Sequence, residues 1–303
     1  MSELNDKVKK SIERLQAFEP TEGYYLAFSG GKDSVACKAL LDMSGCKDDA
    51  TYRVTSVDPP ELVRFIKEQH PDVRREVPLY PDDYKNPKLA GKPISMWNLI
   101  PEKLTPPTRR SRYCCHSLKE SGGDGRMTVT GVRWAESIKR RDNHGVITIP
   151  SKDVRELEDK DDFRKTKFGG FISNNDNDDA RQMVEQCYKK HRTTINPIID
   201  WTDSDIWTFI RSNGIPYCKL YDEGFLRLGC IGCPMAGRKR ENAFFRWPKY
   251  KTAYLLAFNR MLQARIEKGR PTEWQTPEDV FNWWMEYDIL PGQFNLFEDY
   301  QEE

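Results

Sequence analysis

The feature that most constrains the fold is an apolar run that leads directly into a glycine turn and then into a helix. Residues 24–28 (YYLAF) are apolar, residues 29–33 contain two glycines and a lysine, and residues 34–43 have a helical pattern. A second unit of the same kind follows, with a strand over 52–57 and a helix over about 60–70. Successive strand-then-helix units predict an α/β fold built on a parallel twisted sheet with helices on both faces.

The middle of the chain continues this pattern. Further strands are expected over 126–133, with Gly131 where the strand opens into a loop, and over 193–200. Thr202 is placed to cap the helix that comes next. The segment 151–180 is charged and rich in Asn and Asp, which predicts a mobile surface insertion.

Length and composition bound the class of protein. The chain has 303 residues, 38% hydrophobic content and a net charge of +1, which suits an α/β domain over 1–235 and a C-terminal helical region over 236–303. It has no apolar run of about 18 residues and it begins with a charged amphipathic pattern, so we expect a cytoplasmic protein without membrane association. Eight cysteines in a reducing compartment favour metal, cluster or catalytic roles over disulfides.

The glycine turn is suited to binding an anion. In a parallel sheet the strand ends meet at the edge where helices begin, and the positive helix end favours phosphate. Gly30 and Gly31 allow close approach of the backbone, Ser29 and Ser34 supply hydroxyls, and Lys32 supplies a charge. The spacing differs from the Walker loop. A simple strand-to-helix turn capped by Ser34 is the alternative.

Four cysteines form two close pairs, Cys114 with Cys115 and Cys230 with Cys233. Adjacent cysteines suit a [4Fe-4S] cluster, whose separate irons each take one sulfur, whereas zinc favours two C-x-x-C turns. Zinc and unligated thiols stay as alternatives. The other cysteines lack a partner pattern and are expected to be buried structural thiols: Cys37, Cys46, Cys187 and Cys218.

The string SGGKDS after an apolar strand resembles the PP-loop of the ATP pyrophosphatase superfamily, which has the adenine nucleotide alpha hydrolase-like fold. There the loop grips the pyrophosphate of ATP while the α-phosphate is attacked, or holds a sulfonucleotide. Asp58, followed by Pro60 and Glu61, resembles the strand-end aspartate of that superfamily. This implies a contact with ribose or with Mg²⁺. A turn or capping role for Asp58 is the alternative.

The order Cys-Cys, long gap, Cys-x-x-Cys resembles the cluster-bearing phosphoadenylylsulfate and adenylylsulfate reductases. The segments CCHSLKE and GVRWAES, with a later arginine, resemble two further motifs of that family. The implied catalytic residues are Lys32, Asp33, Lys119 and Arg133. The implied nucleotide-binding set comes from the loop and the later motifs: Ser29, Gly30, Gly31, Lys32, Asp33, Ser34, Asp58, Gly131, Arg133, Ser137 and Arg140.

Three departures separate this chain from the reductases. They carry a C-terminal Glu-Cys-Gly nucleophile, whereas residues 234–303 contain no cysteine. Leu118 and Trp134 stand where that family has arginines. DNA phosphorothioation ATP pyrophosphatases and related RNA thiolation enzymes resemble this chain more closely in their motifs, because they keep the loop and often the cluster but lack the tail cysteine.

The resemblance therefore implies an enzyme that cleaves ATP to AMP and pyrophosphate and activates an acceptor for sulfur transfer. It implies a [4Fe-4S] cluster, Mg²⁺, ATP or a sulfonucleotide as substrate, a cysteine desulfurase or sulfur carrier, DNA or RNA, and a homodimer. Basic residues offer a surface for a polyanion, with an ordinary solvated face as the alternative: Arg109, Arg110, Arg112, Lys139, Arg140, Arg141, Arg238, Lys239 and Arg240. A sulfonucleotide reductase that uses Cys218 or an external thiol, and a non-catalytic nucleotide and cluster sensor, stay as alternatives.

Overall fold

The computed structural model describes residues 2–150, 163–166, 170–174, 184, 193–237, 239–270 and 272–285. The chain divides into two compact units. The sheet unit comprises Met1–Arg53, Pro60–Glu76 and Ser121–Leu228. The helical unit comprises Val54–Pro59, Val77–Glu120 and Gly229–Glu303, so it joins the C-terminal helices to two stretches from the first half of the chain.

The sheet unit is built on an eight-stranded sheet with the order β3-β2-β1-β4-β8-β5-β7-β6. Its strands are β1 (Tyr24–Ala27), β2 (Asp48–Arg53), β3 (Arg74–Glu76), β4 (Thr128–Val129), β5 (Ile147–Ile149), β6 (Arg164–Lys165), β7 (Phe171–Ser173) and β8 (Thr194–Ile195). The first five strands in spatial order pair in parallel, and the last three pair antiparallel. The predicted α/β fold is confirmed, and the sheet is mixed rather than wholly parallel.

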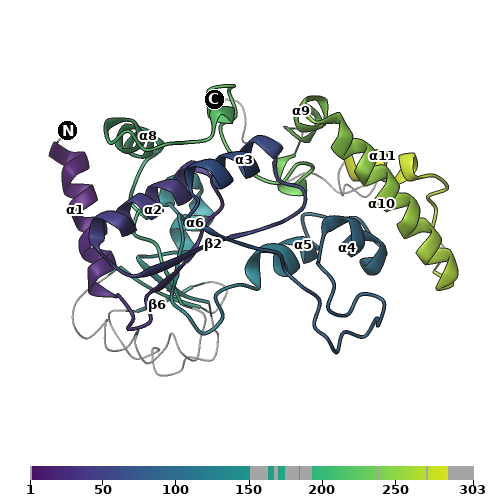
Figure 1. The fold of residues 1–303 in the computed structure, drawn as a ribbon, viewed down its shortest axis with the longest axis horizontal. Coiled ribbons are helices and arrows are strands. Elements are labelled where there is room, and N and C mark those ends of the chain that lie inside the picture. Colours follow the sequence, from purple (N-terminus) through teal and green to yellow (C-terminus); the bar gives the residue numbers. More distant parts are fainter. Residues whose placement is uncertain are drawn as a thin grey trace. The chain divides into compact units, whose positions relative to one another are not determined.

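Among the described helices of the sheet unit, the first precedes β1, the last follows β8 and three connect successive strands (Figure 1). They are α1 (Ser2–Ala17), α2 (Lys32–Ser44), α3 (Pro60–Gln69), α6 (Ile138–Asn143) and α8 (Asp203–Ser212). Helix α2 begins directly after the glycine turn. Gly30 has a φ of 71°, and a Cβ there would lie 2.8 Å from atoms of Ile66 and Leu62 on α3. Only glycine fits this position, so the turn is fixed by both backbone conformation and packing.

Two expectations for the sheet were wrong in detail. The second strand runs over 48–53 instead of 52–57, because Asp48 and Asp49 find cationic partners in Lys38 and Arg126 and so are tolerated in the sheet. The segment 151–180 is not a surface insertion throughout, since its β7 residues are buried and pair with β5, with Ile172 opposite Thr148. Its apolar FIS triplet outweighs the polar composition around it; residues 151–162, 167–169 and 175–180 lie outside the described part.

The helical unit contains α4 (Met96–Lys103), α5 (Tyr113–Cys115), α9 (Lys239–Arg246), α10 (Pro248–Glu267) and α11 (Pro277–Met285). Helix α5 passes directly into a π-helical turn over His116–Glu120. The core is aromatic, with the rings of Tyr254 and Trp284 at 4.7 Å between centroids and Phe244 in contact with both. The Trp284 indole donates to Pro107 O at 2.7 Å. In the described ranges no helix is long and apolar enough to cross a bilayer.

Candidate functional site

The glycine turn between β1 and α2 is closed by its own serines. Ser34 Oγ donates to Gly31 O at 2.9 Å, and Ser29 Oγ lies 3.2 Å from Ser34 Oγ. The Ser29 amide also donates to Ser34 Oγ, at 3.2 Å. These bonds hold the turn in one shape at the positive end of α2, which is the end of a helix that attracts anions.

Lys32 is the first residue of α2, and its side chain is only 8% exposed. Its Nζ lies 3.3 Å from a carboxylate oxygen of Asp33 and 3.3 Å from one of Asp203. Its backbone amide donates to Tyr221 Oη at 2.8 Å. Both the charge and the amide of this residue therefore have acceptors within the protein.

Arg133 completes a group of four charges that we call the loop charge network: Lys32, Asp33, Arg133 and Asp203. The Arg133 side chain is 2% exposed, with Nε 2.7 Å from Asp33 Oδ1 and Nη2 2.6 Å from Asp203 Oδ1. Nη1 donates to Trp201 O at 3.3 Å. Burial disfavours the charged guanidinium, but the Asp33 carboxylate and then Asp203 outweigh it and raise the pKa of Arg133.

Gly131 and the residues after Arg133 lie around this network. A Cβ on Gly131 would come within 2.8 Å of Asp33 Cβ, so the glycine allows β4 to approach the start of α2 closely. Ser137 caps α6 by accepting from the Arg140 amide at 3.3 Å. Burial lowers the pKa of Arg140, with Glu136 opposing that effect and the nearby Arg227 charge adding to it. The structure thus brings the predicted Gly131 and Arg133 against Asp33, while Ser137 has a capping role.

Two residues of this site, Asp203 and Tyr221, are not predicted from the sequence. Asp203 follows the Thr202 cap in the string WTDSDIW, and Tyr221 lies in LYDEGF. Neither string indicates that its side chain turns toward the glycine loop. Only the fold supplies that information.

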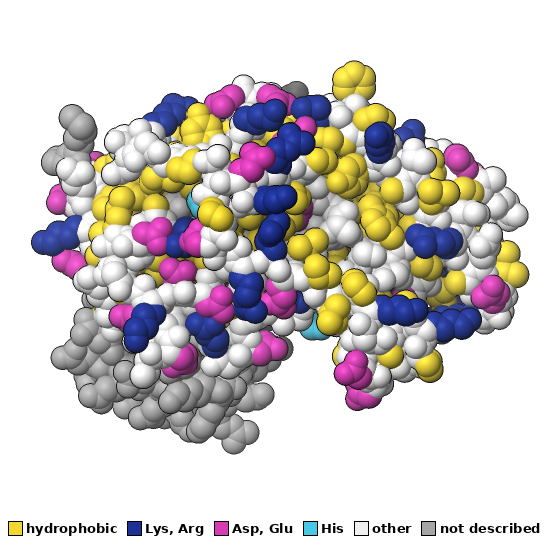
Figure 2. Space-filling model, in the orientation of Figure 1, with side chains coloured by type: hydrophobic (Ala, Val, Ile, Leu, Met, Phe, Trp, Pro, Cys, Tyr) yellow, Lys and Arg dark blue, Asp and Glu magenta, His cyan; other side chains and the backbone are white. Residues whose placement is uncertain are grey.

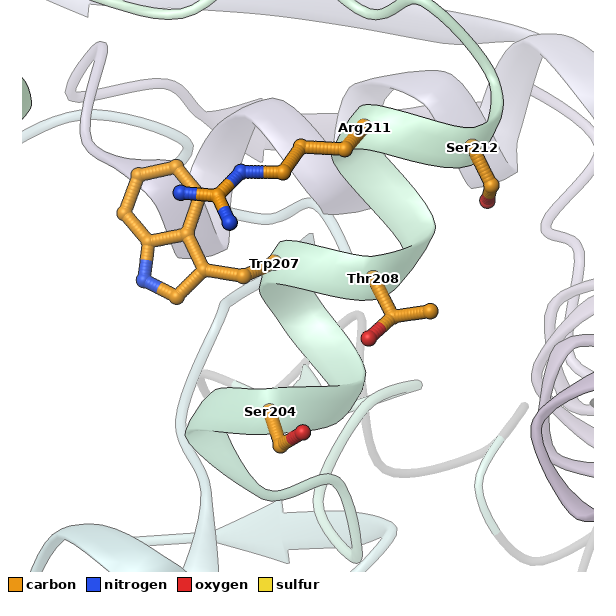
Figure 3. Close-up of a pocket in the computed structure, with 5 residues that line it drawn as sticks. All are labelled: Ser204, Trp207, Thr208, Arg211 and Ser212. Carbon is orange, nitrogen blue, oxygen red and sulfur yellow. The ribbon is translucent and has the colours of Figure 1, made fainter.

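The outer face of α8 carries a shallow cavity of about 490 Å³, lined by Ser204, Trp207, Thr208, Arg211 and Ser212 (Figure 3). The Arg211 guanidinium lies over the Trp207 ring at 5.4 Å. The same indole meets the Tyr221 ring edge-on at 4.9 Å between centroids and that of Tyr217 at 5.3 Å. Trp207 therefore supports the ring whose hydroxyl contacts the glycine loop.

The four paired cysteines all belong to the helical unit. Arg112 Nη2 donates to Cys115 Sγ at 3.3 Å, and Cys230 Sγ lies 3.6 Å from Asp58 Oδ1. Cys114 is hydrogen-bonded to Cys115, and it is close enough to Cys230 and Cys233 for their charges to affect it. Among the residues that the structure describes, no group of three or more His, Cys, Asp or Glu side chains converges on the position of one metal ion.

The thiols differ in their readiness to ionise. The Cys114 thiol donates to Cys115, which raises the pKa of Cys114 and lowers that of Cys115, and Arg112 adds to the second effect. Burial raises the pKa of Cys230 to about 12, against the attraction of Lys119. The pKa of Lys119 is raised, mainly by the negative charge of Cys230. Burial opposes this effect, and the Asp58 carboxylate adds to it. Two cations thus lie against the thiols.

The structure also locates most of the remaining residues that the sequence singled out. Asp58 and Lys119, expected at the nucleotide, lie beside Cys230 in the helical unit, and Tyr250 Oη donates to Asp58 O at 3.1 Å. The predicted burial of the unpaired cysteines is confirmed for Cys37, Cys46 and Cys218. Cys187 lies outside the described residues.

One residue of the predicted basic surface is buried. Arg240 is 2% exposed and donates to Gly237 O and Met285 O, so its placement on an acceptor surface was wrong. Its planar guanidinium lies over the Trp284 ring, which explains the burial. Arg110, Lys139 and Arg141 are exposed, and Arg238 lies outside the described residues. On the face drawn in Figure 2, Lys and Arg side chains lie interspersed with Asp and Glu.

Residues 23–236 match the family described as phosphoadenosine phosphosulfate reductase domain. An uncharacterized protein of Methanocaldococcus jannaschii is 26% identical over 215 residues, which cover 69% of this chain and 41% of that protein. A probable FAD synthase of Caenorhabditis briggsae is 54% identical over 234 residues, or 74% of this chain and 32% of that protein. The chain thus spans less than half the length of these relatives. The structure of a phosphoadenylyl-sulfate reductase from Candida auris, in complex with phosphate, covers 76% of this chain and 95% of its own, with 14% identity and a TM-score of 0.40.

Proposed function

The chain belongs to the phosphoadenosine phosphosulfate reductase domain family, and we propose that it binds ATP and cleaves it to AMP and pyrophosphate. The AMP group is first attached to an oxygen of an acceptor, and this activates the acceptor for sulfur transfer. The observation that carries this proposal is the loop charge network: two buried cations, Lys32 and Arg133, lie at the start of a helix that follows a glycine turn. Such a position favours a chain of phosphates.

The loop and its charged neighbours have defined parts in the proposed reaction. An oxygen of the acceptor attacks the α-phosphorus of ATP, the bond from that phosphorus to the bridging oxygen breaks, and pyrophosphate leaves with the electron pair. Lys32 and the loop amides bind the departing pyrophosphate and neutralise its growing charge. A well-placed donor of this kind contributes about 2.7–4 kcal/mol to the transition state. Asp33 keeps Arg133 oriented beside the loop, and Mg²⁺ is expected on the phosphate oxygens.

We further propose that Cys114, Cys115, Cys230 and Cys233 hold a [4Fe-4S] cluster. The chemistry of the donor set supports this proposal, because all four thiols belong to one unit and Arg112 and Lys119 lie where they would offset the charge of the thiolates. Once bound, a cluster of this type supplies an electron-transfer centre or an iron to which sulfur can attach. Asp58 accompanies the cysteines, since its carboxylate lies beside Cys230.

Sulfur would come from a cysteine desulfurase or a sulfur carrier, whose sulfur nucleophile displaces AMP from the activated acceptor. Nucleic acid is the acceptor that we propose, and the exposed side chains of Arg110, Lys139 and Arg141 are of the kind that contact phosphates. Two other acceptor chemistries have support. The family description favours reduction of a sulfonucleotide with release of sulfite. The relative named as a probable FAD synthase favours FMN, because FAD is FMN joined to AMP.

One set of measurements separates these possibilities. The protein is purified without oxygen, and iron and sulfide are counted per chain. Pyrophosphate release from ATP is then measured alone, with FMN, and with DNA or RNA plus a sulfur donor, and sulfite release is measured from adenylylsulfate and phosphoadenylylsulfate. Pyrophosphate that depends on nucleic acid supports the proposal. FAD formation or sulfite release would replace it with the corresponding alternative, and nucleotide binding without any product would indicate a sensor.

A further inference from the structure

We propose that Asp203 and Tyr221 act as an internal substitute for phosphate, occupying the anion site of the glycine loop until a nucleotide displaces them. The inference rests on the proposed function, since it assigns the loop to a phosphate ligand. It adds two residues that determine how tightly that ligand binds.

The two contacts cover the two kinds of donor that the loop offers. Tyr221 Oη accepts from the Lys32 amide at 2.8 Å, and a Cβ on Gly31 would lie 3.5 Å from the same hydroxyl. Asp203 Oδ1 lies 3.3 Å from Lys32 Nζ and 2.6 Å from Arg133 Nη2. A backbone amide at a helix start and a lysine ammonium are the groups that hold phosphate oxygens in loops of this kind. Oxygen atoms of the protein fill both places.

The two carboxylates of the network differ in how readily they can leave. Asp33 is 24% exposed and is held close to Gly131, where even a methyl group would not fit. Asp203 is 71% exposed and contributes only its carboxylate to the network. Asp33 is therefore the permanent partner of Arg133, and Asp203 is the exchangeable one. When Asp203 swings toward water, a phosphate can take its place without leaving either cation unpaired.

Tyr221 is aimed at the loop by its neighbours. Its ring meets Trp207 edge-on, and Trp207 in turn contacts the ring of Tyr217. The Arg211 guanidinium lies over the Trp207 ring (Figure 3). Asp203 and Trp207 both belong to α8. One segment of the chain, from Asp203 to Tyr221, thus supplies both stand-in groups. A ligand must displace both groups. Its apparent Kd is therefore the intrinsic Kd divided by the fraction of molecules in which both groups are already displaced.

The test is the affinity of the full chain for inorganic pyrophosphate, measured by titration calorimetry. Asp203→Asn removes the carboxylate charge, and Tyr221→Phe removes the hydroxyl but keeps the ring. We expect each variant to bind pyrophosphate about two- to tenfold more tightly than the parent protein. Asp205→Asn is the matched control, because it removes the same charge from the same turn of α8 but pairs with Lys7 and Thr202 instead of the loop. It should leave the affinity within about twofold.

Amide hydrogen exchange at Lys32 provides a readout that needs no ligand. Tyr221→Phe deprives this amide of its acceptor, so its exchange should become faster than in the parent protein. Equal or weaker pyrophosphate binding in both variants, or unchanged exchange at Lys32, would overturn the inference while leaving the proposed function intact. Tighter binding in the variants with no pyrophosphate release from ATP in any condition would support the inference and refute the proposed function. Pyrophosphate binding by none of the proteins would refute both.

Discussion

The ion pair between Arg14 on α1 and Asp200 in the turn before α8, which we call the clamp, offers a quantitative test of how the sheet unit is held together. Arg14 is 4% exposed and forms two bonds of 2.9 Å to the carboxylate of Asp200, while Nη1 also donates to Pro197 O at 2.9 Å. Arg14→Met keeps the helical propensity and most of the apolar stem. It removes all three bonds and leaves the Asp200 carboxylate, 25% exposed, without this partner.

The size of the effect follows from that exposure. Removing one partner of a fully buried ion pair costs about 3–5 kcal/mol, because the other charge stays desolvated. Asp200 still reaches water through its exposed quarter, so we expect a loss of about 2–3 kcal/mol. This corresponds to a lowering of Tm by roughly 4–12 °C for a unit of this size. Lys9→Met, on the exposed face of α1 where the lysine pairs with Glu13, should change stability by less than about 0.5 kcal/mol.

The assay is urea unfolding of Arg14→Met, Asp200→Asn and the double variant, followed by fluorescence. If the clamp is a coupled pair, the double variant loses less stability than the sum of the two single variants, by about 1 kcal/mol or more. The pH dependence gives an independent check. Although burial alone would raise it, the bonds from Arg14 hold the pKa of Asp200 below its ordinary value. Its stabilisation is therefore present above the ordinary pKa of aspartate and is lost as the pH falls through the lowered one.

Arg14→Met should accordingly be less sensitive to acid than the parent protein. Additive effects of the two substitutions, together with an unchanged acid sensitivity, would refute the clamp. A loss of stability no greater than that of Lys9→Met would do the same.

Three further predictions test the site, one of them with a control substitution. Lys32→Ala should lower pyrophosphate release by about 10²- to 10³-fold with little change in the circular dichroism spectrum; unchanged turnover would remove the loop from the reaction. Cys230→Ser should abolish the iron content of protein purified without oxygen, whereas Cys218→Ser, at a buried thiol, should retain it; equal iron in both would contradict the proposed ligands. Gly131→Ala should cost about 1–3 kcal/mol in urea unfolding, because its Cβ would lie 2.8 Å from Asp33 Cβ, and no loss of stability would show that β4 can shift.

The parts of the fold that the sequence predicts well depend on local signals. The apolar run of β1, its glycine turn and α2 follow one another within a few residues, so their order alone specifies them. Thr202 caps α8 as expected, accepting from the Asp205 amide at 3.2 Å. Strand β7 escaped prediction because burial of the FIS triplet depends on β5, more than 20 residues earlier in the chain. A polar composition describes the segment as a whole and does not reveal one short apolar strand within it.

In the site, too, the sequence predicts the residues that carry a local signal and not the partners that come from distant parts of the chain. The glycine, serine and lysine residues of the loop could be assigned from their order, and the two cysteine pairs from their spacing. The partners of Lys32 and Arg133 could not, because Asp203 and Tyr221 reach the loop across 170 or more positions of the sequence. Arg240 illustrates the opposite error. A basic run suggests a solvated surface, yet this arginine has two carbonyl acceptors and an aromatic ring to bury it.

The clamp and the loop charge network share one short stretch of chain, which gives α1 a role in the site. Arg14 fixes Pro197 and Asp200, and Ser11 also donates to Pro197 O and accepts from the Trp201 indole. The next carbonyl along, that of Trp201, accepts from Arg133, and α8 begins two residues later with Asp203. The two acceptors of the Arg133 Nη atoms, Trp201 O and the Asp203 carboxylate, thus follow directly after a turn that α1 holds in place. The turn between them is anchored while the carboxylate of Asp203 stays exposed, so that carboxylate can yield to a ligand without disturbing the backbone that carries it.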